Sequence, residues 1–110
     1  VHGRRGYVVA LLLLAVLVAP IAEEIIFRGL LLRGLLSQLP PWAAITVQAI
    51  LFGAAHVAPE RGWGNIGLAL VLASVGAVFG AAAYLSRRLA PSIIAHAMVN
   101  GIALAIVFSR

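Results

Sequence analysis

Apolar residues run with few interruptions along most of this chain, and the interruptions predict where helices begin and end. The first apolar segment covers residues 7–36. As one straight helix it would be about 45 Å long, whereas the hydrocarbon core of a bilayer is about 30 Å thick. The segment must therefore tilt, kink or protrude. Pro20 lacks the N–H that would bond back to Val16, so we expect a kink or a complete break there.

Turn-forming residues divide the rest of the chain. Pro40 and Pro41 stop the first helix, and Pro41 suits the first turn of the next. The elements expected after them are a short helix at 42–56, an exposed loop at 57–65, a spanning helix at 66–86 and a last helix from 91 to about 108. Gly76 and Gly80 form a small-xxx-small pair, which we expect to pack against a neighbouring helix of the same chain. The pattern predicts an all-α bundle of four helices, or of five if Pro20 breaks the first.

Composition indicates the class of protein. The residues are 64% apolar and only 10% charged, and the mean hydropathy is +1.12. Soluble globular chains are about 45–50% apolar and about 25% charged. The chain has no cysteine, which excludes disulfides and thiolate metal sites. We therefore expect a single polytopic transmembrane domain that lies in the lipid bilayer.

The net charge of +5 comes from eight arginines against three glutamates. Such a balance can indicate a nucleic-acid-binding protein, but most of these arginines flank apolar segments, where lipid headgroups lie. The flanking arginines are Arg4, Arg5, Arg61, Arg87, Arg88 and Arg110. We therefore exclude nucleic acid as a partner. Because the arginines divide equally between the two membrane faces, the positive-inside rule does not fix the orientation.

Glu23, Glu24 and Arg28 are charged residues within sequence that is otherwise apolar. A charge at membrane depth costs roughly 2.5–3.5 kcal/mol, so such groups are by default candidates for a functional site. Glu24 precedes Arg28 by one helical turn, an arrangement that favours an ion pair. Glu23 lies about 100° further round the helix and must face something else. The alternative is that both glutamates only hold helices together through buried ion pairs.

Two histidines lie in predicted helices, and each has a companion one turn away. Phe52 precedes His56, and Asn100 follows His96. A single histidine on an apolar helix is more often a core residue than a ligand or a base. Measured along the helices, however, Glu23 and His56 lie about 20 and 22 Å from the turn at 37–41, and His96 lies about 8 Å from the start of the last helix on the same side of the membrane. These depths agree if the turn after the first helix protrudes by about 10 Å, so we expect the three side chains to meet.

Such a cluster fits a hydrolase. A carboxylate and a histidine can together hold a water molecule and take its proton as it attacks a carbonyl carbon. A second histidine and an amide can donate hydrogen bonds to the oxyanion that forms. The chain has no cysteine nucleophile and no serine in a recognisable nucleophile motif, which favours direct attack by water.

Zinc is the competing chemistry. Glu23, His56 and His96 could supply two imidazoles and a carboxylate and leave an open position for water, as catalytic zinc prefers. The spacing is not HExxH, and the three ligands would come from different helices. The sequence does not separate the two mechanisms, and we favour the one without a metal.

The candidate residues form the motifs Glu23-Glu24-x-x-x-Arg28, Phe52-x-x-x-His56 and His96-x-x-x-Asn100, in that order. The ordered set resembles the CPBP family of intramembrane proteases, which comprises CAAX-prenyl endopeptidases and bacteriocin-processing (Abi) proteins. The similarity covers residues 15–101. It implies that Glu23 and His56 activate the water and that His96 and Asn100 stabilise the oxyanion. It implies supporting roles for the other motif residues, which are Glu24, Arg28 and Phe52.

The resemblance also implies a substrate and a location. We expect a peptide or membrane-protein substrate, prenylated in the case of CAAX tails, and a multi-pass protein of the prokaryotic plasma membrane. The turn at 37–41 would face the cytoplasm. Relatives usually carry additional helices before this core, so we expect residues 1–110 to be one protease core that lacks flanking helices. Family members are often labelled metalloproteases, which keeps zinc open as a cofactor.

Two hypotheses of other classes compete with the protease. The first is a non-catalytic membrane interaction or immunity protein that keeps the motifs for helix packing. The second is a transporter fragment that uses the buried charges as a proton relay, but the chain shows no second repeat.

Overall fold

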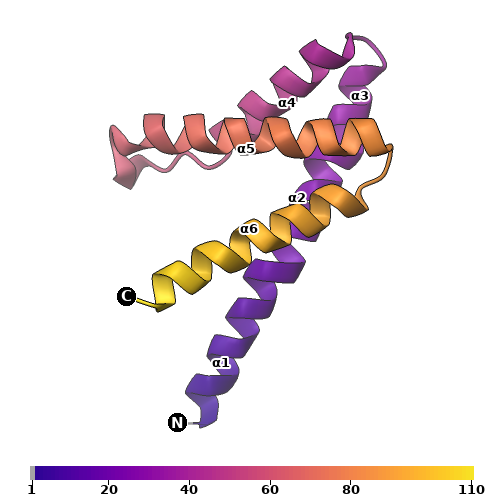
Figure 1. The fold of residues 1–110 in the computed structure, drawn as a ribbon. Coiled ribbons are helices and arrows are strands. Elements are labelled where there is room, and N and C mark those ends of the chain that lie inside the picture. The colour runs from indigo at the N-terminus through magenta and orange to yellow at the C-terminus, as the bar shows by residue number, and fades with distance from the viewer. Residues whose placement is uncertain (1) are drawn as a thin grey trace.

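The computed structural model describes residues 2–110, which form helices joined by short turns, without any strand (Figure 1). One long helix covers Gly3–Leu36. Its sections are α1 (His2–Leu13), η1 (Leu14–Val18), α2 (Ala19–Glu24), η2 (Ile25–Leu31) and α3 (Leu32–Leu36). The later elements are α4 (Pro41–Ala54), the 3-10 turn η3 (Pro59–Arg61), α5 (Gly64–Ser86) and α6 (Ala90–Phe108). The expected all-α fold is confirmed.

Pro20 does not break the first helix, so the described residues form the expected bundle of four helices and not its five-helix alternative. Val18 and Ala19, which precede Pro20, both have right-handed helical φ and ψ. The section η1 is π-helical, and at its end the Ala19 N–H bonds to the Leu14 carbonyl, five residues back. A wide turn of this kind moves the preceding carbonyls away from the proline ring, which would clash with them in a regular α-helix. The helix therefore continues past Pro20.

A second π-helical section, η2, follows the two glutamates and keeps the buried side chains of this helix in line. Buried residues recur every four positions, at Pro20, Glu24, Arg28 and Leu32. In a regular α-helix each step of four residues overshoots a full turn by about 40°, so this stripe would wind around the helix. A π turn contains more residues and reduces the drift. The stripe can therefore face the other helices along its length.

The other three helices pack on this stripe (Figure 1). α5 lies against η2, α4 packs along α5, and α6 returns against α2 and η1. α1 extends beyond this crossing toward the N-terminus. Three helices are long and apolar enough to span a membrane, namely Gly3–Leu36, Gly64–Ser86 and Ala90–Phe108, while α4 is apolar but shorter.

Glycines let α4 and α5 approach closely. A Cβ at Gly53 of α4 would lie 2.5 Å from a backbone carbonyl oxygen of α5. A Cβ at Gly80 would collide with the Gln48 side chain, and one at Gly76 would lie 3.0 Å from the Phe52 ring. Small residues at an interface are what allow close helix packing in a bilayer. The expectation that Gly76 and Gly80 pack within the chain is confirmed.

Candidate active site

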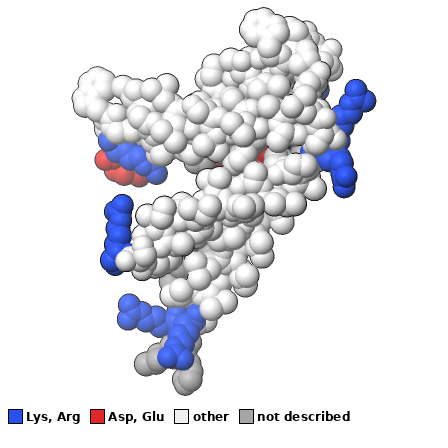
Figure 2. Space-filling model, in the orientation of Figure 1, with Lys and Arg blue, Asp and Glu red and all other residues white. Residues whose placement is uncertain are grey.

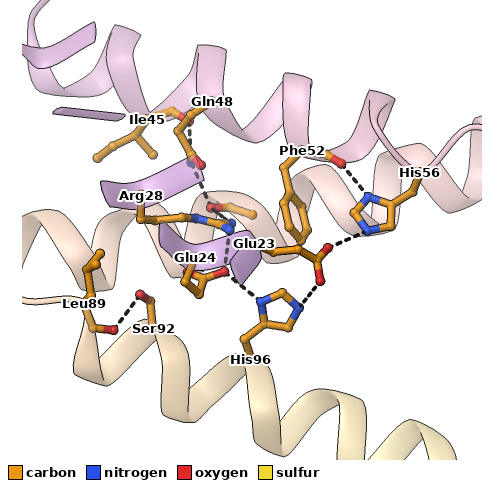
Figure 3. Close-up of polar contacts among 11 residues, drawn as sticks. Glu23, Glu24, Arg28, Ile45, Gln48, Phe52, His56, Leu89, Ser92 and His96 are labelled. Atoms are coloured by element: carbon orange, nitrogen blue, oxygen red, sulfur yellow. Dashed lines mark hydrogen bonds and ion pairs between the residues drawn. The ribbon is translucent and has the colours of Figure 1, made fainter. Parts of the chain in front are cut away.

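Buried polar side chains meet where the first helix crosses the other helices (Figure 3). Glu24 and Arg28 form the expected ion pair, with Arg28 Nη1 2.6 Å from Glu24 Oε2 and both side chains fully buried. Arg28 Nη2 also donates to the Gly76 carbonyl of α5 at 3.1 Å. The guanidinium carbon lies 4.4 Å from the centroid of the Phe52 ring of α4. The pair therefore ties the first helix to both α4 and α5.

His96 of α6 extends this series of polar contacts. Its Nδ1 donates to Glu24 Oε2 at 2.7 Å, so Arg28 and His96 share one carboxylate oxygen. Its ring stacks on Phe79 of α5, with the centroids 5.1 Å apart. These contacts fix the ring so that Nε2 is directed toward Glu23, with Oε2 at 3.8 Å. Glu24 thus holds other side chains in place from a fully buried position.

Glu23 is the carboxylate that remains accessible. Its Oε1 lies 3.3 Å from His56 Nε2, and its Oε2 faces His96. About 29% of the Glu23 side chain and 31% of the His56 side chain are exposed, against 0% for Glu24 and 6% for His96. The structure therefore brings Glu23, His56 and His96 together, and the two accessible members are Glu23 and His56.

His56 lies outside a helix, and the expectation of a helix as far as His56 is wrong at that end. α4 ends at Ala54, and His56 stands in the turn that follows. The Phe52 carbonyl, which would accept the His56 backbone N–H in a longer helix, accepts its Nδ1 at 2.7 Å instead. The backbone N–H turns to the Gly53 carbonyl at 3.2 Å. The hydrogen bond from the His56 side chain to the Phe52 carbonyl thus ends the helix and fixes the orientation of the imidazole ring.

This hydrogen bond determines which ring nitrogen of His56 faces Glu23. Because a carbonyl can only accept, the Nδ1 of His56 carries the proton in that contact. Nε2 and Glu23 Oε1 are then two facing acceptors 3.3 Å apart. The pair is arranged to hold one proton between its members, which is what a general base requires.

A cavity of about 240 Å³ opens onto these groups. Its lining consists of Glu23, Phe52, His56, Leu72, Val75, Phe79, His96, Val99 and Asn100. Five of these nine residues are apolar, and among the polar ones Glu23 faces both His56 and His96. Enzyme sites commonly place a few polar groups in a largely apolar cavity in this way.

Asn100 lines the cavity, but one of its amide protons is used elsewhere. Its Nδ2 donates to the Ala15 carbonyl at 2.9 Å. Because the Ala19 N–H bonds to Leu14, the π pairing would match the Ala15 carbonyl with Pro20, which has no N–H. Asn100 supplies the missing donor and so ties α6 to the first helix beside Pro20.

The sequence analysis missed Gln48 as a member of this cluster. Gln48 is fully buried, and its Nε2 donates to the Ile45 and Gly76 carbonyls, both at 2.9 Å. The Gly76 carbonyl therefore receives both Gln48 and Arg28, which fixes the guanidinium from a second side. A lone amide in the apolar helix was the available signal, since polar groups at membrane depth mark functional regions. Phe79, which stacks on His96, had no such signal.

The same atoms allow the fit of a metal ion to be tested. Both imidazoles present Nε2, and their Nδ1 atoms contact a carbonyl and a carboxylate, as metal-binding histidines often do. Among the side chains of residues 3–110, however, no group of three or more His, Asp, Glu or Cys is arranged to hold a metal ion. The two oxygens of Glu23 are each directed at a different imidazole. The arrangement does not fit the zinc site considered from the sequence.

Comparison with known proteins identifies the family to which the chain belongs. No curated protein and no solved structure matches the chain. A family model described as type II CAAX prenyl endopeptidase, Rce1-like, matches residues 5–102. The match covers nearly the whole chain and includes every side chain of the site, and it agrees with the three apolar spans. The chain therefore belongs to the Rce1-like family of type II CAAX prenyl endopeptidases, which are proteases of the membrane.

Proposed function

We propose that this chain is an intramembrane endopeptidase in which Glu23 and His56 activate a water molecule. One observation carries the proposal, namely the division of labour between two adjacent glutamates. Glu24 is fully buried and paired with Arg28, whereas Glu23 is accessible and lies between the Nε2 atoms of two histidines. A carboxylate kept only for helix packing would not need this second environment.

In the proposed reaction, water enters beside Glu23 Oε1 and His56 Nε2. The pair takes one proton from the water as its oxygen forms a bond to the carbonyl carbon of the substrate. The carbonyl electrons move onto the oxygen and produce a tetrahedral oxyanion. When the C–N bond breaks, the proton passes from the pair to the leaving nitrogen, so that a carboxylic acid and an amine result. General-base catalysis of this kind contributes about 10²–10⁴-fold to the rate.

His96 and Asn100 are the proposed donors to the oxyanion. His96 has Nδ1 committed to Glu24, and its Nε2 lies 3.8 Å from Glu23, beyond hydrogen-bond distance. Nε2 is therefore free to donate when it is protonated. The amide of Asn100 has two N–H groups, and Ala15 uses only one of them. Loss of one such donor costs about 10²–10³-fold in kcat.

We propose a CAAX-type peptide or membrane-protein tail, carrying a prenyl group, as the substrate class. The family description supports the CAAX sequence. The apolar side of the cavity, formed by Leu72, Val75 and Val99, supports a substrate with a hydrophobic group next to the bond that is cut.

The test is hydrolysis of a quenched fluorescent CAAX peptide, prenylated and unprenylated, by the purified chain in nanodiscs. Glu23→Gln removes the base but keeps the size of the side chain, and we expect the rate to fall at least about 10²-fold. Glu60→Gln is the matched control, because Glu60 is exposed in the loop. Both variants should keep the wild-type helical circular dichroism and melting temperature. Activity should persist in EDTA, and its loss with recovery on adding zinc would contradict the metal-free mechanism.

The result that overturns the proposal is equally defined. If folded wild-type protein cleaves neither peptide, the proposed CAAX endopeptidase activity is wrong. If Glu23→Gln cleaves as fast as Glu60→Gln, Glu23 is not the base. A non-catalytic interaction protein would then explain the buried cluster better. Preference for the prenylated peptide tests the substrate class separately from the chemistry.

A further inference from the structure

A second cavity, of about 360 Å³, lies on the side of Arg28 that faces the turn between α5 and α6. Its polar lining consists of Arg28, Arg33, Tyr84, Arg87 and Arg88. None of the groups proposed to carry the hydrolysis borders it. The active-site cavity and this one have no lining residue in common.

The arginines around this cavity are not neutralised. Among residues 2–110, Arg33, Arg87 and Arg88 make no ion pair within 4.0 Å. The chain has only three glutamates; two belong to the active-site cluster and Glu60 lies in the loop before α5. Three uncompensated positive charges therefore surround one hollow, and they are suited to a ligand with negative charge.

Arg28 supplies an independent observation that points to a ligand. It lines the cavity although only 1% of its surface is exposed. Nη1 and Nη2 are satisfied by Glu24 and Gly76, but Nε is buried without a hydrogen-bond partner among the described residues. A buried N–H without an acceptor is unfavourable, and nearly all such groups have one. A side chain that lines the cavity therefore keeps one hydrogen-bond donor unused.

The position of the cavity indicates where the anion comes from. It lies where three helices end or begin, at Leu36, Ser86 and Ala90. Figure 2 shows arginine side chains in blue at this end of the molecule, where α5 turns into α6. Helix ends rich in arginine, with an exposed aromatic residue such as Tyr84, are typical of the membrane interface.

The remaining wall is apolar and contains Leu32, Leu36 and Leu89. A free inorganic anion would gain nothing from these side chains, whereas a phospholipid has apolar glycerol and acyl groups next to its phosphate. Basic pockets between transmembrane helices bind anionic headgroups in this manner. We propose that this cavity binds the phosphate headgroup of an anionic phospholipid, with Arg33, Arg87 and Arg88 around the phosphate.

Arg87 allows a variant that removes charge without weakening the fold. It ends α5 with φ of 57°, in the left-handed region where glycine is the favoured residue. Arg87→Gly should therefore relieve the backbone while it removes one positive charge. Combined with Arg88→Gln, it deletes two charges from the cavity. The matched control is Arg4→Gln with Arg5→Gln, an adjacent pair at the far end of the first helix.

The experiment is native mass spectrometry of the full chain in detergent with dioleoyl phosphatidylglycerol or dioleoyl phosphatidylcholine as the probe. We expect one phosphatidylglycerol to bind the wild type at least about 10-fold more tightly than phosphatidylcholine. Removal of the two charges should weaken phosphatidylglycerol binding about 30-fold, and the control pair should leave it unchanged. The glycine variant must also melt at or above the wild-type temperature.

Four outcomes overturn the proposal. Equal binding of the two lipids removes the need for an anionic headgroup. Equal losses in the variant and in the control pair show general attraction of charge. Inorganic phosphate that binds as tightly as phosphatidylglycerol makes the ligand a free anion. The fourth outcome is that the double variant of Arg87 and Arg88 raises KM for a peptide with a free terminal carboxylate, but not for its amide, and leaves lipid binding unchanged. That result assigns the cavity to the substrate. Glu23 does not line this cavity, so Glu23→Gln should bind phosphatidylglycerol like the wild type. The lipid test therefore stands apart from the test of the proteolytic mechanism.

Discussion

The first helix has two parts that differ in environment much more than in hydrophobicity. The N-terminal arm (residues 3–13) is exposed over almost its whole length, and its side chains make no hydrogen bond to the rest of the described chain. The central stripe (residues 20–32) buries one residue in four against α4, α5 and α6. Both parts are rich in leucine, isoleucine and valine.

The comparison shows what brings helices together in this protein. Apolar side chains are as stable against lipid tails as against each other, so hydrophobicity alone does not select an interface. The central stripe adds charges that need partners, and it meets helices whose glycines permit close approach. The arm has neither feature. The site therefore forms where polar groups require neutralisation and small residues allow it.

The largest expected effect is on catalysis, at the site that Glu23 of the central stripe forms with His56. His56→Ala removes the nitrogen that faces Glu23, and we expect kcat/KM to fall about 10³-fold, with the melting temperature nearly unchanged because His56 is partly exposed. Peptide cleavage in nanodiscs measures it. Leu11→Ala in the arm should be indistinguishable from wild type, and equal losses in both variants would remove the distinction between the two parts.

Next is the loss of one member of the buried ion pair. Arg28→Met leaves Glu24 buried without its cation, and we expect about 3–5 kcal/mol of destabilisation. Arg4→Met removes the same charge from the arm and should change stability by less than about 0.5 kcal/mol. Unfolding in mixed detergent micelles measures both. Adding Glu24→Gln to Arg28→Met should recover part of the loss, and no recovery would mean that packing rather than charge was lost.

Close packing should give a smaller effect. Gly53→Ala places a methyl group 2.5 Å from a backbone oxygen of α5, so we expect about 1–3 kcal/mol of destabilisation. Gly6→Ala in the arm meets nothing within 4 Å and should stabilise the helix by about 0.5–1 kcal/mol. The same unfolding assay compares the two. Changes of opposite sign in the free energy of unfolding support close packing at the crossing, and changes of the same sign contradict it.

The smallest expected effect concerns the tie between Asn100 and the carbonyl beside Pro20. Asn100→Ala leaves the Ala15 carbonyl without a donor, at a cost of about 1 kcal/mol. Pro20→Ala restores a backbone N–H that can bond to this part of the helix, so the Asn100 substitution should cost little in that background. A double-mutant cycle of unfolding free energies measures the coupling. Additive effects would show that Asn100 does not compensate for the proline.

Much of the fold could be predicted from the sequence because the signals are local. Pro40 and Pro41 mark the first turn, the polar loop marks the second, and the apolar runs between them are long enough to be helices. The π turns could not be predicted, since a helix that is apolar all round shows no change of period. A kink or a break was expected at Pro20, and the sequence could not decide between a break and a continuous helix, because the outcome depends on the π turn before the proline.

The site was predictable to a similar extent and for similar reasons. The pairing of Glu24 with Arg28 follows from their spacing, and the structure confirms the contact. The meeting of Glu23 with His56 and His96 followed from helix lengths. The Gln48 contact with Gly76 depends on how α4 crosses α5, which only tertiary packing determines. The catalytic roles of these residues remain predictions.

The most direct test of the account compares two neighbouring carboxylates in one experiment. Glu23→Gln and Glu24→Gln each remove one charge, and both the melting temperature and kcat/KM for peptide cleavage are measured on the same preparations. The account predicts that Glu23→Gln melts like the wild type and loses at least about 10²-fold in kcat/KM, whereas Glu24→Gln melts at a clearly lower temperature. Identical profiles for the two variants, or the reverse assignment, would contradict the division between a chemical and a structural glutamate.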